Sequence, residues 1–342
     1  MRVLGSDPDI EIVGCASDGA TAYALCRALR PSVVTLDMEM PGSSGLEATE
    51  RIMADCPTPI LIVSASRNRR DAFNTFDALA AGAMDVLDKP RGDDTDAAWA
   101  QKLIATVKVM ARVKPISHPR RRLPPLRAAR SERRSQPRIA PVSTAGPAFR
   151  LVAIGASTGG PSAVARILGE LPPGFPLPIL VVIHIGSHFG APLADWLDTL
   201  SPFAVRQAVD GEPLPEIDDA RVLLAAPDRH LMVEGERIRL IDGPERNFSR
   251  PSVEVLFESV ARSFGPRAIG CLLTGMGSDG ATGLLELRRA GALTIAQDET
   301  SSVVYGMPRA AALLGAAAEV LPLSEISGRI LAATNRLTEG AP

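Results

Sequence analysis

Between residues 9 and 90, short runs of apolar, often β-branched residues alternate with segments whose apolar positions recur at helical spacing. Such runs predict strands, and the periodic segments predict amphipathic helices. Strands are expected at residues 10–15, 33–36, 59–63 and 84–87, and helices at residues 20–29, 45–54 and 71–81. Strands and helices that alternate in this way favour an α/β domain with a parallel sheet covered on both faces.

Residues 112–147 have a different texture, rich in arginine and proline and without a periodic apolar pattern. A segment of this kind cannot bury enough surface to offset its ordering entropy, so we interpret it as a linker. A solvated tether and an electrostatic patch for an acidic partner are both compatible with this composition. Aromatic residues do not alternate with the arginines, which argues against nucleic acid as that partner.

The strand and helix alternation returns from residue 149 onwards. Strands are expected at residues 151–154, 178–183, 221–225, 268–273 and 293–296, and helices at residues 161–171 and 283–290. We therefore predict an N-terminal α/β domain over residues 1–111, a linker over residues 112–147, and a C-terminal domain over residues 148–338. The C-terminal domain is expected to be a three-layer α/β/α fold with a doubly wound, mostly parallel sheet.

Composition agrees with two cytoplasmic domains. The 342 residues are 46% hydrophobic, and the formal net charge of −2 exerts no overall attraction on nucleic acid or anionic lipid. The four cysteines show no C-x-x-C spacing, which disfavours a disulfide framework or a zinc site. The N-terminus lacks a signal-like apolar segment, and no stretch is long enough to insert directly into a membrane.

Three polar residues of the N-terminal domain stand where predicted strands end. They are Asp37, Ser64 and Lys89. An acceptor carboxylate, a hydroxyl and an ammonium group at one edge of a parallel sheet can together hold a phosphoryl group. With the Met40-Pro41-Gly42 loop and the Lys89-Pro90 dipeptide, the segment resembles the response-regulator receiver family, which has a flavodoxin-like fold.

This resemblance makes Asp37 the phosphorylated aspartate, Ser64 the switch hydroxyl and Lys89 the conserved lysine. It also implies that Asp37 contributes to a Mg²⁺ site used in phosphorylation, with a histidine kinase as phosphodonor. The family's first strand and the acidic pair that completes this metal site have no counterpart here, since Arg2-Val3-Leu4 resembles the tail of the first helix. We expect the natural protein to begin upstream of Met1.

A glycine-rich turn marks the start of the C-terminal domain. The sequence Gly155-Ala156-Ser157-Thr158-Gly159 satisfies G-x-S-x-G and lies between a predicted strand and a predicted helix. A nucleophilic Ser157 would then lie at a helix N-terminus, where developing negative charge is stabilised. A phosphate-cradling turn or a purely structural turn would have the same pattern.

A serine nucleophile requires a base, and four histidines are available: His118, His184, His188 and His230. His118 falls in the linker. His184 ends a predicted strand on the same sheet edge as Ser157, which favours it over His188 and His230. A third strand ends in Thr274-Gly275-Met276-Gly277-Ser278-Asp279, and Asp279 could orient His184. A structural role for Asp279 in a tight glycine turn remains the alternative.

Five ordered motifs carry a specific resemblance to the catalytic domain of CheB-type chemotaxis protein-glutamate methylesterases. They are the Gly155–Gly160 turn, Pro227-Asp228-Arg229-His230-Leu231, Arg250-Pro251-Ser252-Val253, Leu273 to Gly280, and Gln297-Asp298-Glu299 with Tyr305-Gly306-Met307-Pro308. The resemblance makes Ser157, His184 and Asp279 the catalytic residues. It makes the backbone N–H of Met276 an oxyanion donor. The chain departs from the family pattern after His184, where Ile185-Gly186 replaces a Met-Pro turn, and at Ser278, where the family often has Asn.

The resemblance implies a serine hydrolase that demethylates glutamyl esters of chemoreceptors and also deamidates receptor glutamines. Its activity would be controlled by phosphorylation of the receiver, and the hydrolysis would need no cofactor. A catalytically silent scaffold that binds receptors is the alternative function. A DNA-binding regulator is disfavoured because the second domain is α/β. A nucleotide-binding module is disfavoured because the glycine turn has no fitting fingerprint.

Overall fold

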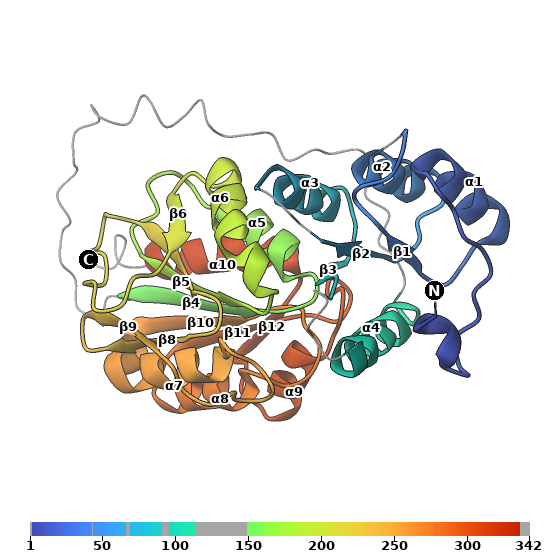
Figure 1. The fold of residues 1–342 in the computed structure, drawn as a ribbon. Helices are drawn as coiled ribbons and strands as arrows, with labels where there is room; N and C mark the ends of the chain where they lie inside the picture. The colour runs from blue at the N-terminus through green and yellow to red at the C-terminus, as the bar shows by residue number, and fades with distance from the viewer. Residues whose placement is uncertain (1, 43, 66–68, 91–95, 114–148, 336–342) are drawn as a thin grey trace. The chain divides into compact units, whose positions relative to one another are not determined.

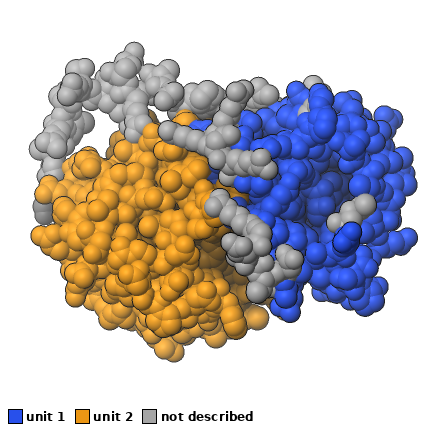
Figure 2. Space-filling view, viewed as in Figure 1, with its two compact units in different colours: residues 1–123 blue, residues 124–342 orange. Residues whose placement is uncertain are grey.

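The computed structural model describes residues 2–42, 44–65, 69–90, 96–113 and 149–335. The chain divides into two compact units, Met1–Leu123 and Pro124–Pro342 (Figure 2). Nearly all of the expected linker at residues 112–147 lies outside the described residues, so the interpretations of its arginines stay predictions.

The N-terminal unit contains a three-stranded parallel sheet with the order β1-β2-β3 (Figure 1). Its strands are β1 (Val34–Leu36), β2 (Ile60–Ser64) and β3 (Asp85–Asp88), and its helices are α1 (Gly19–Leu29), α2 (Gly45–Asp55), α3 (Arg69–Ala80) and α4 (Asp96–Met110). Local signals set the helix starts. The Asp18 carboxylate caps α1 by accepting the N–H of Thr21 at 2.8 Å, and the Ser44 hydroxyl caps α2.

The strand expected at residues 10–15 is absent, and this prediction was wrong. The segment has no regular secondary structure and pairs with no strand among the described residues, and its Ile12 and Val13 are 43% and 47% exposed. A β-strand exists through hydrogen bonds to a neighbouring strand, so an apolar run without such a neighbour stays irregular.

A seven-stranded sheet with the order β12-β11-β10-β4-β5-β7-β6 forms the centre of the C-terminal unit, and all its neighbouring strands are parallel. The strands are β4 (Leu151–Ala156), β5 (Ile179–Ile183), β6 (Ala204–Gln207), β7 (Arg221–Leu224), β10 (Ala268–Leu272), β11 (Leu293–Gln297) and β12 (Glu319–Leu321). Every residue of β4 is buried, as expected for a strand covered on both faces.

Helices cover the two faces of this sheet in separate sets (Figure 1). One set is α5 (Gly160–Glu170), α6 (Gly190–Leu200) and α10 (Leu323–Asn335), and the other is α7 (Val253–Phe264), α8 (Ala281–Arg289) and α9 (Met307–Leu313). An antiparallel hairpin of β8 (His230–Glu234) and β9 (Arg237–Ile241) packs beside α7. The described part of the chain contains no helix long and apolar enough to cross a membrane.

The chain changes direction across the sheet at β4. The next strands of the sheet along the chain, β5, β6 and β7, all lie on one side of β4, and the later strands β10, β11 and β12 lie on the other side. The connections that follow β4 and β10 therefore diverge at the carboxyl ends of these two strands. In doubly wound folds this switch point is where ligands bind, and Ser157 directly follows β4.

Candidate active site

Strand register places Ser157 between two neighbouring strand ends. Ala156 pairs with Ile183 in the parallel ladder of β4 and β5, so the next residue of each strand, Ser157 and His184, lie side by side. The N–H of His184 donates to the carbonyl of Ala156 at 3.1 Å. On the other side, the N–H of Ser157 donates to the carbonyl of Thr274, just after β10, at 3.0 Å.

His184 and Asp279 form a direct pair. Nε2 of His184 lies 2.8 Å from Oδ2 of Asp279, and the two side chains are 17% and 3% exposed. The two residues are 95 positions apart in the chain and meet because β5 and β10 flank β4. Of the three residues expected to form a triad, the structure thus joins two directly and places the third, Ser157, beside them. Among the described residues, the Ser157 hydroxyl takes part in no recorded hydrogen bond.

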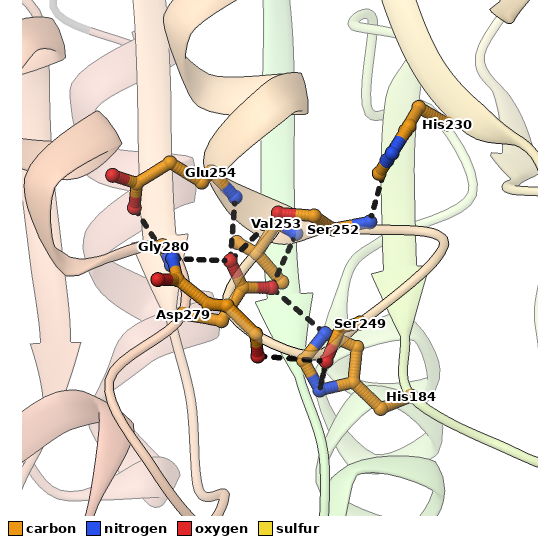
Figure 3. A network of polar contacts seen from close by, with 9 residues as sticks. His184, His230, Ser249, Ser252, Val253, Glu254, Asp279 and Gly280 are labelled. Carbon is orange, nitrogen blue, oxygen red and sulfur yellow. Dashed lines mark hydrogen bonds and ion pairs between the residues drawn. The ribbon is translucent and has the colours of Figure 1, made fainter. Parts of the chain in front are cut away.

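Asp279 accepts four further hydrogen bonds, all from residues 247–254 at and just before the start of α7 (Figure 3). The donors are Ser252 Oγ at 2.7 Å, Val253 N at 2.7 Å, Glu254 N at 3.2 Å and Asn247 Nδ2 at 3.2 Å. The carboxylate therefore occupies the N-terminus of α7, where free N–H groups and the helix dipole stabilise a negative charge.

These contacts set the charge of Asp279. Its burial acts to raise the pKa, but the hydrogen bonds from His184, Ser252 and Val253 and the charge interaction with His184 together lower the pKa below its ordinary value. An ionised carboxylate can only accept, so Nε2 of His184 carries the proton. The lone pair of His184 then resides on Nδ1, which is the nitrogen able to take a proton from a nucleophile. Nδ1 lies 3.5 Å from Oγ of Ser249.

The other two candidate bases of this unit are placed differently. His230 is 1% exposed; its Nδ1 accepts the N–H of Ser252 at 3.2 Å, so its Nε2–H donates to the carbonyl of Pro244 at 2.9 Å. With both ring nitrogens engaged, His230 supports the start of α7. His188 is exposed on the short helical turn Ser187–Phe189.

Glu254 mirrors Asp279. Its own N–H donates to Asp279, while its carboxylate Oε2 accepts the N–H of Gly280 at 3.0 Å, directly before α8. The carboxylate of Asp279 therefore lies at the N-terminus of α7, which carries Glu254. The carboxylate of Glu254 lies at the N-terminus of α8, which begins shortly after Asp279. Burial, and then the nearby charge of Asp279, raise the pKa of Glu254 despite the hydrogen bonds that it accepts.

Two glycines allow the close approach that builds this site. Gly155 lies within β4, where an added Cβ would come within 2.1 Å of Cγ1 of Val253. The absence of a side chain at Gly155 therefore leaves room for α7. Gly155 does not form the turn that the motif indicated, because it belongs to the strand. A Cβ on Gly275 would lie 2.3 Å from Sδ of Met307 and 2.7 Å from Cβ of Ser157. The loop after β10 therefore packs directly against the proposed nucleophile.

Met276 follows Gly275 in this loop. The N–H of Gly275 donates to the carbonyl of Val304, and the carbonyl of Gly275 accepts two N–H groups, so the loop is fixed on both sides. Among the bonds of the described residues, none uses the N–H of Met276, and its side chain is 43% exposed. Within the described residues this N–H is thus available to donate, as an oxyanion donor must be.

Sequence reasoning did not single out Asn247, Ser249 or Glu254, and it named Ser252 only as part of a motif, without a role. A serine followed by an acidic residue and an apolar periodic run does indicate the start of a helix. Ser252, however, uses its hydroxyl to donate to Asp279 and makes no side-chain cap of α7. No local pattern reveals a donor whose partner lies 27 residues away.

In the N-terminal unit the predicted residues also gather at one sheet edge. Asp37 follows β1, Ser64 ends β2, and Lys89 follows β3; Lys89 Nζ forms an ion pair with Asp37. The Lys89 N–H donates to the carbonyl of Ser64 at 2.9 Å. No group of three or more His, Cys, Asp or Glu that could hold a metal occurs within the described ranges. Since Mg²⁺ requires several oxygen ligands, these residues do not by themselves fit the ion.

Comparison with known proteins matches both units. A CheB methylesterase family profile matches residues 152–330, and a response regulator receiver domain profile matches residues 1–97. A protein-glutamate methylesterase/protein-glutamine glutaminase of Anaeromyxobacter dehalogenans is 44% identical over 95% of this chain and 90% of its own length. One from Myxococcus xanthus is also 44% identical, over 97% and 92%. The catalytic domain of Thermotoga maritima CheB methylesterase superposes with a TM-score of 0.51 at 34% identity, covering 54% of this chain and 98% of that domain.

Proposed function

The chain belongs to the CheB methylesterase family, and from this premise we propose that it hydrolyses glutamyl methyl esters of proteins and releases methanol. The observation that carries the proposal is the His184–Asp279 pair beside Ser157 at the switch point of the sheet. A hydroxyl, an imidazole with one available lone pair and an ionised carboxylate are the groups that acyl transfer to water requires.

The reaction proceeds in two halves. Oγ of Ser157 attacks the γ-carbonyl of the ester while Nδ1 of His184 takes the hydroxyl proton, and Asp279 stabilises the imidazolium that forms. The N–H of Met276 donates to the oxyanion of the tetrahedral intermediate. His184 then protonates the departing methoxide to give methanol. Water attacks the acyl-enzyme with the same base, which regenerates Ser157 and leaves a glutamate.

Glutamine deamidation is proposed as a second activity of the same site. The glutaminyl carboxamide presents the same carbonyl with an amine in place of methoxide, so His184 would protonate departing ammonia. The names of the curated relatives include both activities, and this supports the proposal.

The substitution Ser157→Ala tests the assignment of the nucleophile, with Ser249→Ala as a matched control. Both serines lie near His184, but only Ser157 lies at the end of β4 beside a helix N-terminus. Methanol release from a methylated receptor should be abolished by Ser157→Ala and should stay within tenfold of wild type in Ser249→Ala. The reverse result would assign the nucleophile to Ser249. A wild-type chain that binds the receptor without releasing methanol would be the silent scaffold.

Control of the esterase is proposed to come from the N-terminal unit. The ion pair of Lys89 with Asp37, and Ser64 at the adjacent strand end, supply the acceptor, cation and hydroxyl that a phosphoryl group needs. We take Asp37 as the phosphorylated residue, a histidine kinase as the phosphodonor, and methylated chemoreceptors in the cytoplasm as the substrates.

A further inference from the structure

A two-residue turn beside the active site has an unfavourable composition for its backbone. Arg246 and Ser249 exchange backbone hydrogen bonds of 3.1 and 3.0 Å around Asn247 and Phe248, whose φ angles are 50° and 60°. Such type I′ geometry favours Asn at the first central position, as found here, and Gly at the second. Phenylalanine at a positive φ is unusual, because its Cβ crowds the backbone there. The fold therefore holds Phe248 in a strained position.

The side chain of Phe248 is not buried against the described part of the chain, so no packing offsets this strain. It is 98% exposed, the highest value among the large apolar residues of the described part of the chain. Strained residues of this kind persist where the surrounding structure holds them, and they cluster at functional sites. An exposed aromatic side chain on a rigid turn is also the form that an anchor at an interface takes.

The residues before and after Phe248 in this turn both contact proposed catalytic residues. Asn247 Nδ2 donates to Oδ1 of Asp279 at 3.2 Å, and Oγ of Ser249 lies 3.5 Å from Nδ1 of His184. The two flanking side chains thus face the site while Phe248 faces solvent. Phe248 therefore projects from a turn whose two neighbouring residues contact Asp279 and His184. Met276, on the loop that carries Asp279, adds a second exposed apolar side chain.

We propose that Phe248 is a specificity-determining residue that docks the substrate protein by packing against an apolar side chain close to its esterified glutamate. The inference rests on the proposed function, because a protein substrate is what supplies a surface next to the ester. The ester itself is small and reaches Ser157 alone, so Phe248 serves recognition of the protein and leaves the chemical steps to the catalytic residues.

The experiment measures binding in a Ser157→Ala background, so that turnover is not needed. The probe is a methylated cytoplasmic fragment of a chemoreceptor, and its Kd is compared with and without Phe248→Gly in the full chain. The dissociation constant should rise about tenfold, which corresponds to about 1.4 kcal/mol. The midpoint of urea unfolding should stay the same or rise, because glycine adopts the turn without strain. A structural role for Phe248 would lower that midpoint.

Turnover supplies the second readout. With Ser157 intact, Phe248→Gly should raise KM for the receptor fragment about tenfold and leave kcat within twofold, and Phe248→Leu should lie between. Leu313→Ala is the matched control, since Leu313 is 77% exposed at the last position of α9, and it should change neither constant.

Unchanged Kd and KM in Phe248→Gly would overturn the proposal. Increased turnover would also overturn it and assign Phe248 to a contact within the chain. If the wild type released no methanol, the proposed function would fail while the binding comparison still decided the role of Phe248.

Discussion

Replacing Asp279 with asparagine tests the central pair with the least change in shape. The amide keeps one acceptor oxygen and puts a donor where the other oxygen stood. At the Oδ2 position this donor would face Val253 N–H, now 2.7 Å away, and His184 Nε2, now 2.8 Å away. At the Oδ1 position it would face Glu254 N–H and the hydroxyl of Ser252. In either orientation, the amide NH₂ of the asparagine would face groups that are themselves hydrogen-bond donors.

The contacts of Asp279 allow the size of the loss in stability and of the loss in kcat to be estimated. A buried N–H of Val253 left without an acceptor costs about 1–3 kcal/mol, and losing a hydrogen bond to a charged group costs about 1.5–3 kcal/mol. Because these terms overlap, Asp279→Asn should lower the free energy of unfolding by about 2–4 kcal/mol. If the amide instead donates to Nε2 of His184, the ring proton moves to Nδ1 and the base is lost. The wrong tautomer costs about 10⁴-fold in kcat in serine protease triads.

Urea unfolding at pH 7 and methanol release from a methylated receptor measure the two losses. Asp210→Asn is the control, because Asp210 also accepts a backbone N–H, from Leu240 at 2.8 Å, but is exposed and remote from the triad. The control should change stability by less than about 1 kcal/mol and leave kcat unchanged. If Asp279→Asn kept kcat within tenfold of wild type, the assigned tautomer would be wrong.

The pH dependence of the stability loss has a definite sign. Folding lowers the pKa of Asp279, so this carboxylate stabilises the native state above its unfolded pKa of about 3.9. That contribution disappears as the pH falls through the lowered folded pKa. The difference in unfolding free energy between wild type and Asp279→Asn should therefore be largest near neutral pH and should shrink in acid. A difference that grew in acid would contradict the contacts described for Asp279.

Substitutions at three further positions probe the groups around this pair. Met276→Pro should reduce kcat about 10²–10³-fold, the usual cost of one oxyanion donor, whereas Met276→Leu should cost little; equal losses would show that the side chain matters. His230→Phe should destabilise the chain by about 2–4 kcal/mol in urea unfolding, because it strands Ser252 N–H, yet methanol release should stay above that of Ser157→Ala. Glu254→Ala should cost about 1–3 kcal/mol in unfolding free energy, because it leaves the Gly280 N–H without an acceptor. Glu254→Gln should cost less than Glu254→Ala, because the amide oxygen can still accept this N–H and the amide does not carry the charge whose burial raises the pKa of Glu254.

Local pattern was sufficient for much of the fold and for the sheet edge that carries the site. Buried apolar runs such as residues 151–154 and 178–183 predict strands because parallel strands covered on both faces need continuous apolar sequence. Parallel strands place their carboxyl ends at one edge, so Ser157 and His184 could be expected there together. The comparisons confirm the predicted family and its α/β fold.

The segment at residues 10–15 shows where local pattern failed. Its β-branched residues have strand propensity, but a strand is completed only by hydrogen bonds from a neighbour. Whether a neighbour lies beside a segment is a property of the tertiary arrangement. Ile12 and Val13 therefore remain exposed in an irregular segment, although the same residues in a sheet would be buried.

What the sequence by itself determined was which residue types stand at strand ends, and hence that Ser157, His184 and Asp279 share one edge. Tertiary structure alone decided how they are used. Packing of α7 against β4 brings the free N–H groups of the helix to Asp279, and these hydrogen bonds help to lower the pKa of that carboxyl. The ionised carboxylate leaves the lone pair of His184 on Nδ1, the nitrogen that we propose as the base. The turn that carries Phe248 approaches His184 through the neighbouring Ser249. These contacts join segments far apart in the chain, and long-range packing has no signature in local periodicity.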